Sequence, residues 1–279
     1  MFNTRYILAN CNSGQKKEGV KNGANVLFNE LKAHMGLDNV FDNLRENKKV
    51  YNTIDSRLFV NKSGYHRLYD STKTLLDRES SVVTLGGDHS ISVSTTSAFF
   101  DKFLDDGVLL WIDAHADVNT TESSPSGNTH GMPVASTFGL MHNLISQEYI
   151  PTFDQIIYLG LRDIDTWERE VLRNHKITYY TTKHIRDKSM IVVLDEINRI
   201  IDRKKNLHVS FDVDAMDPQI ISATGTPVPG GFSMGDIERI IKAIPLYKVR
   251  CLDFVEYNPE LEENCNSLEN AVKILNMFF

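Results

Sequence analysis

The stretch Val108-Leu109-Leu110-Trp111-Ile112 runs directly into Asp113-Ala114-His115-Ala116-Asp117, so an apolar run meets a polar cluster. Four more short runs of β-branched and aliphatic residues end in polar residues in the same way. They are 82–85, 156–159, 207–211 and 249–255. The most continuous of these runs are typical of strands buried on both faces, which indicates a parallel sheet.

Helical patterns lie between these runs. Residues 189–203 carry an apolar stripe at helical spacing, and 271–279 are predicted to form a final helix. The segment Ser233-Met-Gly-Asp236 resembles a capping box that starts another helix. Strands that alternate with helices predict either a doubly wound parallel sheet or a β/α barrel.

Length and composition are those of an ordinary globular protein. The chain has 279 residues, of which 41% are hydrophobic and 24% charged, enough to bury a full core. There is no internal repeat or Gly/Ser-rich linker, so we expect residues 1–279 to form a single domain. The net charge is −7, and no block of basic residues stands out, which argues against a nucleic-acid partner.

The cysteine pattern and the apolar runs indicate in which cellular compartment the protein is expected. Cys11, Cys251 and Cys265 share no C-x-x-C spacing, and free thiols suit a reducing cytosol. The apolar run near the N-terminus has three residues, and no run approaches the roughly 20 that a membrane span needs. We therefore expect a cytoplasmic protein with no membrane partner.

The ends of three predicted strands carry six candidate metal ligands. They are His89, Asp113, His115, Asp117, Asp212 and Asp214. Ligands bind at the carboxyl ends of parallel strands. If the strand pitch continues, side chains at every second position point to one side, so the three ligands of 113–117 would point together, and so would the pair 212 and 214.

Charge and ligand type suggest which metal these residues would hold. Four carboxylates in one place repel each other unless cations neutralise them. Carboxylates with some imidazole and no thiolate suit Mn²⁺ better than a structural zinc. Two divalent ions would neutralise the four carboxylates and could supply hydroxide at neutral pH. Five further histidines lack this context and are predicted to be surface or core residues. They are His66, His142, His175, His184 and His208.

Three motifs carry a resemblance to a known family. Gly86-Gly-Asp-His-Ser90, the cluster 113–117 and Ser210-Phe-Asp-Val-Asp-Ala-Met-Asp-Pro218 resemble the three signatures of the ureohydrolases, the arginase and agmatinase family. The similarity starts at Gly14-Gln15 and ends at 256–259. It implies a three-layer α/β/α domain with a mostly parallel sheet.

The resemblance implies a role for each ligand and for three catalytic groups. One Mn²⁺ would be bound by His89, Asp113, Asp117 and Asp212, and the second by His115, Asp113, Asp212 and Asp214. Asp113 and Asp212 would bridge the ions, and Asp117 could hold the proton of a bridging hydroxide. Glu256 would pair with a guanidinium group, because a carboxylate and a guanidinium can form a bidentate pair of hydrogen bonds. His130 would relay a proton to the leaving amine.

The resemblance also suggests the substrate, L-arginine, with ornithine and urea as products. Residues 126–131 read Ser-Gly-Asn-Thr-His-Gly and resemble the arginase substrate loop. The amino-acid end of the substrate would be recognised by Asn119, Ser126, Asn128 and Asp165, and Thr226 would line the site. Asp88, Asp163 and Asp217 are expected to be supporting residues. The family is usually trimeric or hexameric, so a homo-oligomer is expected.

Three alternatives stay open at this point. An agmatinase or another guanidino hydrolase would differ at Ser126, Asn128 and Asp165. A deacylase of the related fold would use one zinc and keep only part of the ligand set. A non-catalytic regulatory subunit would have lost a ligand, His130 or Glu256. The chain departs from the family pattern at Ser222 and Tyr257, neither of which is a predicted ligand.

Overall fold

The computed structural model describes residues 4–34, 50–263 and 266–279, and Cys265 lies outside them. Eight strands form one sheet in the order β2-β1-β3-β8-β7-β4-β5-β6, and every neighbouring pair is parallel. The strands are β1 Thr4–Ala9, β2 Val50–Ile54, β3 Ser81–Gly86, β4 Gly107–Ile112, β5 Ile156–Leu161, β6 Thr178–Thr181, β7 Asn206–Asp212 and β8 Val249–Val255.

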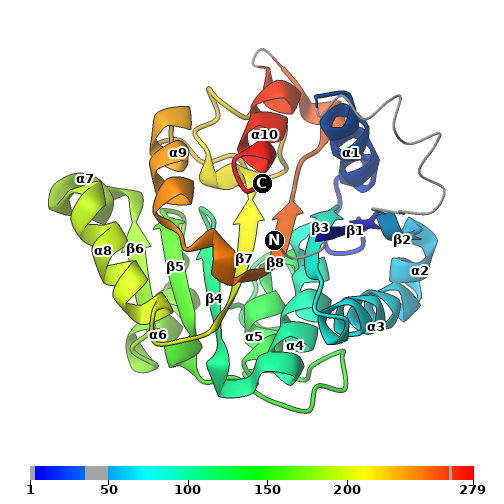
Figure 1. The fold of residues 1–279 in the computed structure, drawn as a ribbon, viewed down its shortest axis with the longest axis horizontal. Helices are drawn as coiled ribbons and strands as arrows, with labels where there is room; N and C mark the ends of the chain where they lie inside the picture. The colour runs from blue at the N-terminus through cyan, green and yellow to red at the C-terminus, as the bar shows by residue number, and fades with distance from the viewer. Residues whose placement is uncertain (1–3, 35–49, 264–265) are drawn as a thin grey trace.

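Helices cover both faces of the sheet (Figure 1). The first face packs against α1 Gly23–His34, α7 Thr182–Lys188, α8 Met190–Ile201, α9 Met234–Ala243 and α10 Ser267–Asn276. The second packs against α2 Ser56–Val60, α3 Ser63–Asp77, α4 Ser92–Phe103, α5 Pro133–Thr137 and α6 Thr166–Asn174. This is the expected three-layer α/β/α architecture with an open parallel sheet, not a barrel.

The two cores follow from side-chain alternation along the strands. In β4, Val108, Leu110 and Ile112 enter the core of the first face, while Leu109 and Trp111 enter the second. Successive strand side chains point to opposite faces, so a continuous apolar run feeds both layers. This is why the run 108–112 predicted a buried parallel strand.

The five predicted strands are present as β3, β4, β5, β7 and β8, and three others were not predicted. β6, Thr-Tyr-Tyr-Thr, is half-buried throughout. β1 and β2 lie at the opposite end of the strand order from β6. Helix α8 matches the stripe at 189–203, and Ser233 and Asp236 form the expected capping box of α9. The last helix, α10, begins four residues earlier than expected and ends at Asn276.

The strand order brings together the carboxyl ends of the four strands that carry the candidate site residues. β3, β8, β7 and β4 are consecutive in the sheet, although the chain passes directly from β3 through α4 to β4. Such a change of direction in strand order opens a crevice at the carboxyl edge. Among the described residues, no helix is long and apolar enough to cross a membrane.

Candidate metal centre and active site

A turn, rather than continued strand pitch, brings the ligands of the 113–117 segment together. β4 ends at Ile112 and bends follow it. The backbone N–H of His115 donates to Asp113 Oδ1 at 2.7 Å, and Asp117 has a φ of 50°. The expectation that strand pitch would align these three side chains is therefore wrong, because the backbone leaves the strand before the first of them.

The second ligand pair is also arranged by a turn. Asp212 is the last residue of β7, and Asp214 lies in a single 3₁₀ turn, Val213–Ala215. The backbone N–H of Asp214 donates to Asp212 Oδ1 at 2.7 Å. Each of these acidic side chains therefore helps to shape the loop that presents the other ligands.

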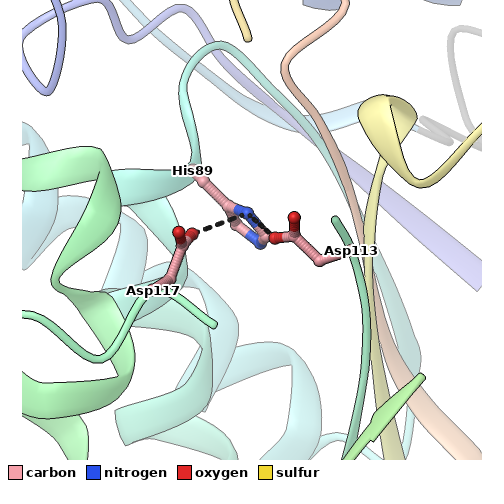
Figure 2. Close-up of side chains that lie close together, drawn as sticks. All are labelled: His89, Asp113 and Asp117. Atoms are coloured by element: carbon pink, nitrogen blue, oxygen red, sulfur yellow. Dashed lines mark ion pairs between the residues drawn. The ribbon is translucent and has the colours of Figure 1, made fainter. Parts of the chain in front are cut away.

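The imidazole of His89 is the centre of one group of ligands. Its Nδ1 lies 3.1 Å from each of three carboxylate oxygens, those of Asp113, Asp117 and Asp212. Figure 2 shows His89 between Asp113 and Asp117. This nitrogen is buried and makes no well-directed hydrogen bond. Three acidic oxygens around an unsatisfied imidazole nitrogen fit a site for a divalent cation.

Neighbouring side chains hold this ring in place. His89 Nε2 lies 2.8 Å from Ser210 Oγ, and the ring stacks on Trp111 with centroids 4.1 Å apart. Trp111 Nε1 donates to Asp113 Oδ2 at 2.9 Å. A hydrogen bond at the far nitrogen of a ligating histidine fixes its tautomer and orientation, which here would leave Nδ1 for the metal.

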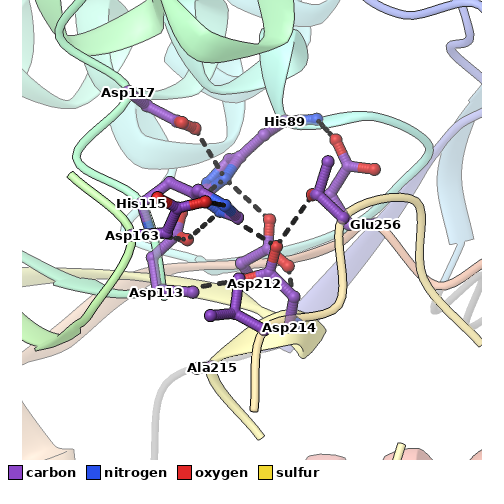
Figure 3. Close-up of polar contacts among 12 residues, drawn as sticks. His89, Asp113, His115, Asp117, Asp163, Asp212, Asp214, Ala215 and Glu256 are labelled. Carbon is purple, nitrogen blue, oxygen red and sulfur yellow. Dashed lines mark hydrogen bonds and ion pairs between the residues drawn. The ribbon is translucent and has the colours of Figure 1, made fainter. Parts of the chain in front are cut away.

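A second group of ligands surrounds His115 (Figure 3). Its Nδ1 lies 3.1 Å from Asp214 Oδ2 and 3.4 Å from Asp113 Oδ1, so Asp113 belongs to both groups. Thr226 donates to Asp214 Oδ2 at 3.1 Å. The carboxylate of Asp163 lies 3.7 Å from His115 Nε2, in a supporting position. The structure thus brings all six predicted ligands to one place.

The pKa values express how unfavourable this cluster is without cations. Burial raises the pKa of Asp212 well above its usual value, and the charges of Asp214 and Asp113 raise it further. Burial and Asp113 together raise the pKa of Asp117 to about 6. Burial alone would lower the pKa of His89, but the three carboxylates around it raise this pKa well above its usual value. A bound cation would reverse these effects by stabilising carboxylate and neutral imidazole.

Glu256 lies directly after β8 and contacts the predicted ligand His89. It has a φ of 66°, and its side chain is 1% exposed. Its Oε1 accepts from the backbone N–H of His89 at 2.8 Å and lies 3.0 Å from His130 Nδ1. Its Oε2 accepts from Gln15 Nε2 at 2.5 Å. The resemblance includes Gln15 in its first segment but implied no role for it, because only the fold brings this early loop to the end of the last strand.

The pair of His130 and Glu256 is held in its ionised form. Burial alone would lower the pKa of His130, but the hydrogen bond and charge of Glu256 raise it to about 9. Burial would raise the pKa of Glu256, yet the hydrogen bond and charge of His130 lower it overall. His130 therefore carries a proton at neutral pH.

An open cavity of about 220 Å³ leads to the predicted metal ligands. Among the predicted substrate and catalytic residues, its lining includes Asp117, Asn119, Ser126, His130, Asp165 and Thr226. Asn128 is not part of the lining; its backbone N–H donates to Ser126 Oγ at 3.2 Å. Glu256 is not part of it either, but its carboxylate contacts His130, which is.

Asp165 has two tasks at the mouth of this cavity. It forms the N-cap of α6, with Oδ1 accepting from the backbone N–H of Glu168, and its Oδ2 accepts from Asn119 Nδ2 at 2.7 Å. Glu168, which the sequence analysis did not single out, also lines the cavity. Burial raises the pKa of Glu168 to about 8, and Asp117 and Asp165 add to this.

The remaining predictions concern residues away from the ligands. Of the five histidines predicted to be surface or core residues, four are exposed, while His208 is buried beside Asp253. Asp88 accepts from the backbone N–H of Gly14, and Asp217 from that of Gly230, both at 2.8 Å. A larger cavity of about 600 Å³ has apolar side chains of α2 and the 140–144 loop in its wall, and its lining contains none of the six predicted metal ligands.

Comparison with known proteins agrees with the motifs and the geometry. The Arginase family matches residues 6–279. The arginase of Saccharomyces cerevisiae is 33% identical, over 95% of this chain and 90% of its own, and that of Entamoeba histolytica is 32% identical, over 98% and 96%. The crystal structure of the Entamoeba histolytica arginase with L-ornithine superposes with a TM-score of 0.86 over 99% of this chain and 98% of that one, at 31% identity. The structure of the Bacillus caldovelox arginase gives 0.87 over 100% and 98%, at 26% identity. This chain, with its six converging ligands and its open parallel sheet, belongs to the Arginase family.

Proposed function

We propose that this chain is an arginase that hydrolyses L-arginine to L-ornithine and urea at a centre of two Mn²⁺ ions. The observation that carries the proposal is the convergence of two imidazoles and four carboxylates at the end of a cavity lined by hydrogen-bonding groups. The arginase structure with L-ornithine supports an amino-acid ligand in a cavity of this fold.

The ligand set suits two cations that share carboxylates. His89 with Asp113, Asp117 and Asp212 would hold one ion, and His115 with Asp113, Asp212 and Asp214 the other. Two such ions would supply a hydroxide nucleophile at neutral pH. Mixed imidazole and carboxylate donors favour Mn²⁺ over the purely oxygen-ligated Ca²⁺.

The chain's own residues would position the substrate and move protons. Glu256 would accept a hydrogen bond from the guanidinium and orient its central carbon. His130 is protonated at neutral pH and lines the cavity, so it can donate a proton to the departing amine. Asp117, whose pKa is about 6 before a cation binds, would accept a hydrogen bond from the nucleophile.

Selection of arginine over agmatine would depend on the mouth of the cavity. The two molecules differ by the α-carboxylate. Ser126 and Asn119 can donate to such a group, Asp165 can accept from an α-ammonium, and Asn128 would support the Ser126 turn. Charge-assisted hydrogen bonds of this kind are each worth about 1.5–3 kcal/mol, so the loss of two or more would reduce kcat/KM by several powers of ten.

A urea-release assay tests this function directly. With Mn²⁺ present, we expect kcat/KM for L-arginine to exceed that for agmatine and guanidinobutyrate by at least 10³-fold. Comparable values for arginine and agmatine would move the assignment to an agmatinase. No urea from any of the three compounds would favour a non-catalytic relative.

We further propose that the chain assembles as a homo-oligomer. A trimer is expected by analogy with the family, and fold-level analogy is its only support. Light scattering at micromolar concentration should give about three times the chain mass, and a monomer would refute the proposal.

A further inference from the structure

Gln15 reaches Glu256 from a segment that is distant in sequence. It lies in the loop after β1, 241 residues before Glu256, and its Nε2 donates to Glu256 Oε2 at 2.5 Å. The other oxygen, Oε1, is occupied by the backbone N–H of His89 and by His130. The Glu256 carboxylate therefore has partners from three loops, and Gln15 is the one that holds Oε2.

The hydrogen-bonding capacity of a carboxylate makes this contact consequential. Two carboxylate oxygens offer about four lone-pair positions, and three are in use. One position on Oε2 remains for a substrate N–H. Both acceptor positions of Oε1 are taken, so the bidentate guanidinium pair that the resemblance implied cannot form unless His130 or the N–H of His89 moves away from Oε1. With both partners in place, Glu256 can bind a guanidinium through one oxygen only.

We infer that Gln15 is a positioning residue, which fixes the rotation of the Glu256 carboxylate so that its single free acceptor position faces the substrate guanidinium. This inference rests on the proposed guanidinium-binding role of Glu256. Gln15 itself does not line the cavity, so its effect would pass through Glu256.

The packing around Gln15 explains why residue 225 is a glycine. A Cβ added to Gly225 would lie 2.8 Å from Gln15 Oε1, closer than real Cβ contacts come. The missing side chain of Gly225 thus leaves the space in which the Gln15 amide sits. Gly225 would then act on Glu256 through Gln15, although it is next to Thr226, which contacts a metal ligand.

The first test is the Gln15→Ala variant in the Mn²⁺-loaded enzyme. The guanidinium keeps its charged partner, so KM for arginine should change less than about threefold, while kcat should fall about 10- to 100-fold because the reacting carbon is misaligned. Mn²⁺ affinity should stay within about twofold. Lys16→Ala, at the neighbouring exposed position, is the matched control and should keep wild-type kinetics.

A double-mutant cycle with Gly225→Ala gives the decisive readout. That variant should reproduce the loss of kcat, and combining it with Gln15→Ala should add little, because both would act on the same contact. Multiplicative losses, a changed Mn²⁺ affinity, or a wild-type kcat in Gln15→Ala would each overturn the inference. Failure of the wild-type enzyme to release urea would instead refute the proposed function.

Discussion

At the scale of single residues, Asp165 shows how one carboxylate can serve both structure and recognition. Its Oδ1 caps α6, while Oδ2 accepts from Asn119 at the cavity mouth. Loss of an N-cap usually destabilises a protein by about 1 kcal/mol. An alanine at this position would therefore reduce stability and substrate binding together, and the two effects could not be separated.

Serine separates the two tasks, because its hydroxyl can cap a helix but carries no charge. We expect Asp165→Ser to unfold in urea within about 0.5 kcal/mol of the wild type and to raise KM for arginine about 10- to 100-fold. Asp165→Ala should show the same KM and lose about 1 kcal/mol of stability as well. An unchanged KM in both variants would remove Asp165 from substrate recognition.

The pair of His130 and Glu256 predicts a specific pH dependence of stability. The pKa of His130 is raised from 6.5 to about 9. A raised pKa contributes stability that is complete below pH 6.5 and is lost as the pH rises through 9. In metal-free protein, wild type should exceed His130→Asn in unfolding free energy by on the order of 1–3 kcal/mol near pH 6.5. The difference should disappear near pH 10.

Urea denaturation of both proteins at several pH values would measure this difference. A difference in unfolding free energy that stays the same at every pH would mean that His130 contributes through packing rather than through its charge. Because Glu256 is held ionised by the same contact, the comparison should be restricted to pH values above the usual range of a glutamate.

At the scale of elements, sequence patterns predicted the central strands better than the loops. Runs such as 108–112 are buried on both faces, so their apolar composition is sufficient to identify them. β6 lies at an edge of the sheet and is half-buried, which gives no such run. The six ligands could be identified from their residue types and places at strand ends, whereas the turn at Asp117 and the contact of Gln15 depend on tertiary packing.

The turn between β3 and α4 depends on a close approach of two backbones. A Cβ at Gly87 would lie 1.8 Å from the carbonyl oxygen of Cys11, and His89 follows two residues later. We expect Gly87→Ala to lose at least about 2 kcal/mol of stability, since backbone cannot yield as a side chain can, and to weaken Mn²⁺ binding by displacing His89. Thermal unfolding and metal titration would measure the two effects.

Gly235 provides the matched control for this substitution. It lies in the first turn of α9, and its nearest neighbour to an added Cβ is Ser233 Oγ at 3.9 Å. Gly235→Ala should be neutral or stabilise the protein by up to about 1 kcal/mol. If the two alanine variants were equally stable, the close approach at Gly87 would not be a structural constraint.

At the scale of the whole molecule, the proposed metal centre joins loops from four strands across the middle of the sheet. The predicted ligands follow or end β3, β4 and β7, and Glu256 follows β8 (Figure 3). The buried carboxylates repel one another in the metal-free protein, and the raised pKa of Asp212 and of Asp117 records this repulsion. Cation binding should therefore stabilise the entire fold and not only the loops.

Linkage gives the size of this stabilisation. A ligand that binds only the folded state at 100 times its Kd adds about 2.7 kcal/mol for one site. For a chain of this length each kcal/mol raises Tm by roughly 2–4 °C. Calorimetry should therefore show a rise in Tm of at least about 5 °C when Mn²⁺ is added to EDTA-treated protein.

Asp212→Ala should lose most of this rise, because Asp212 is proposed to bind both ions. Ca²⁺ at equal concentration should give a smaller rise, since the site presents two imidazoles and Ca²⁺ prefers oxygen ligands. Equal Tm values in Mn²⁺ and in EDTA would contradict the metal centre itself, and equal rises with Mn²⁺ and Ca²⁺ would contradict only the proposed preference for manganese.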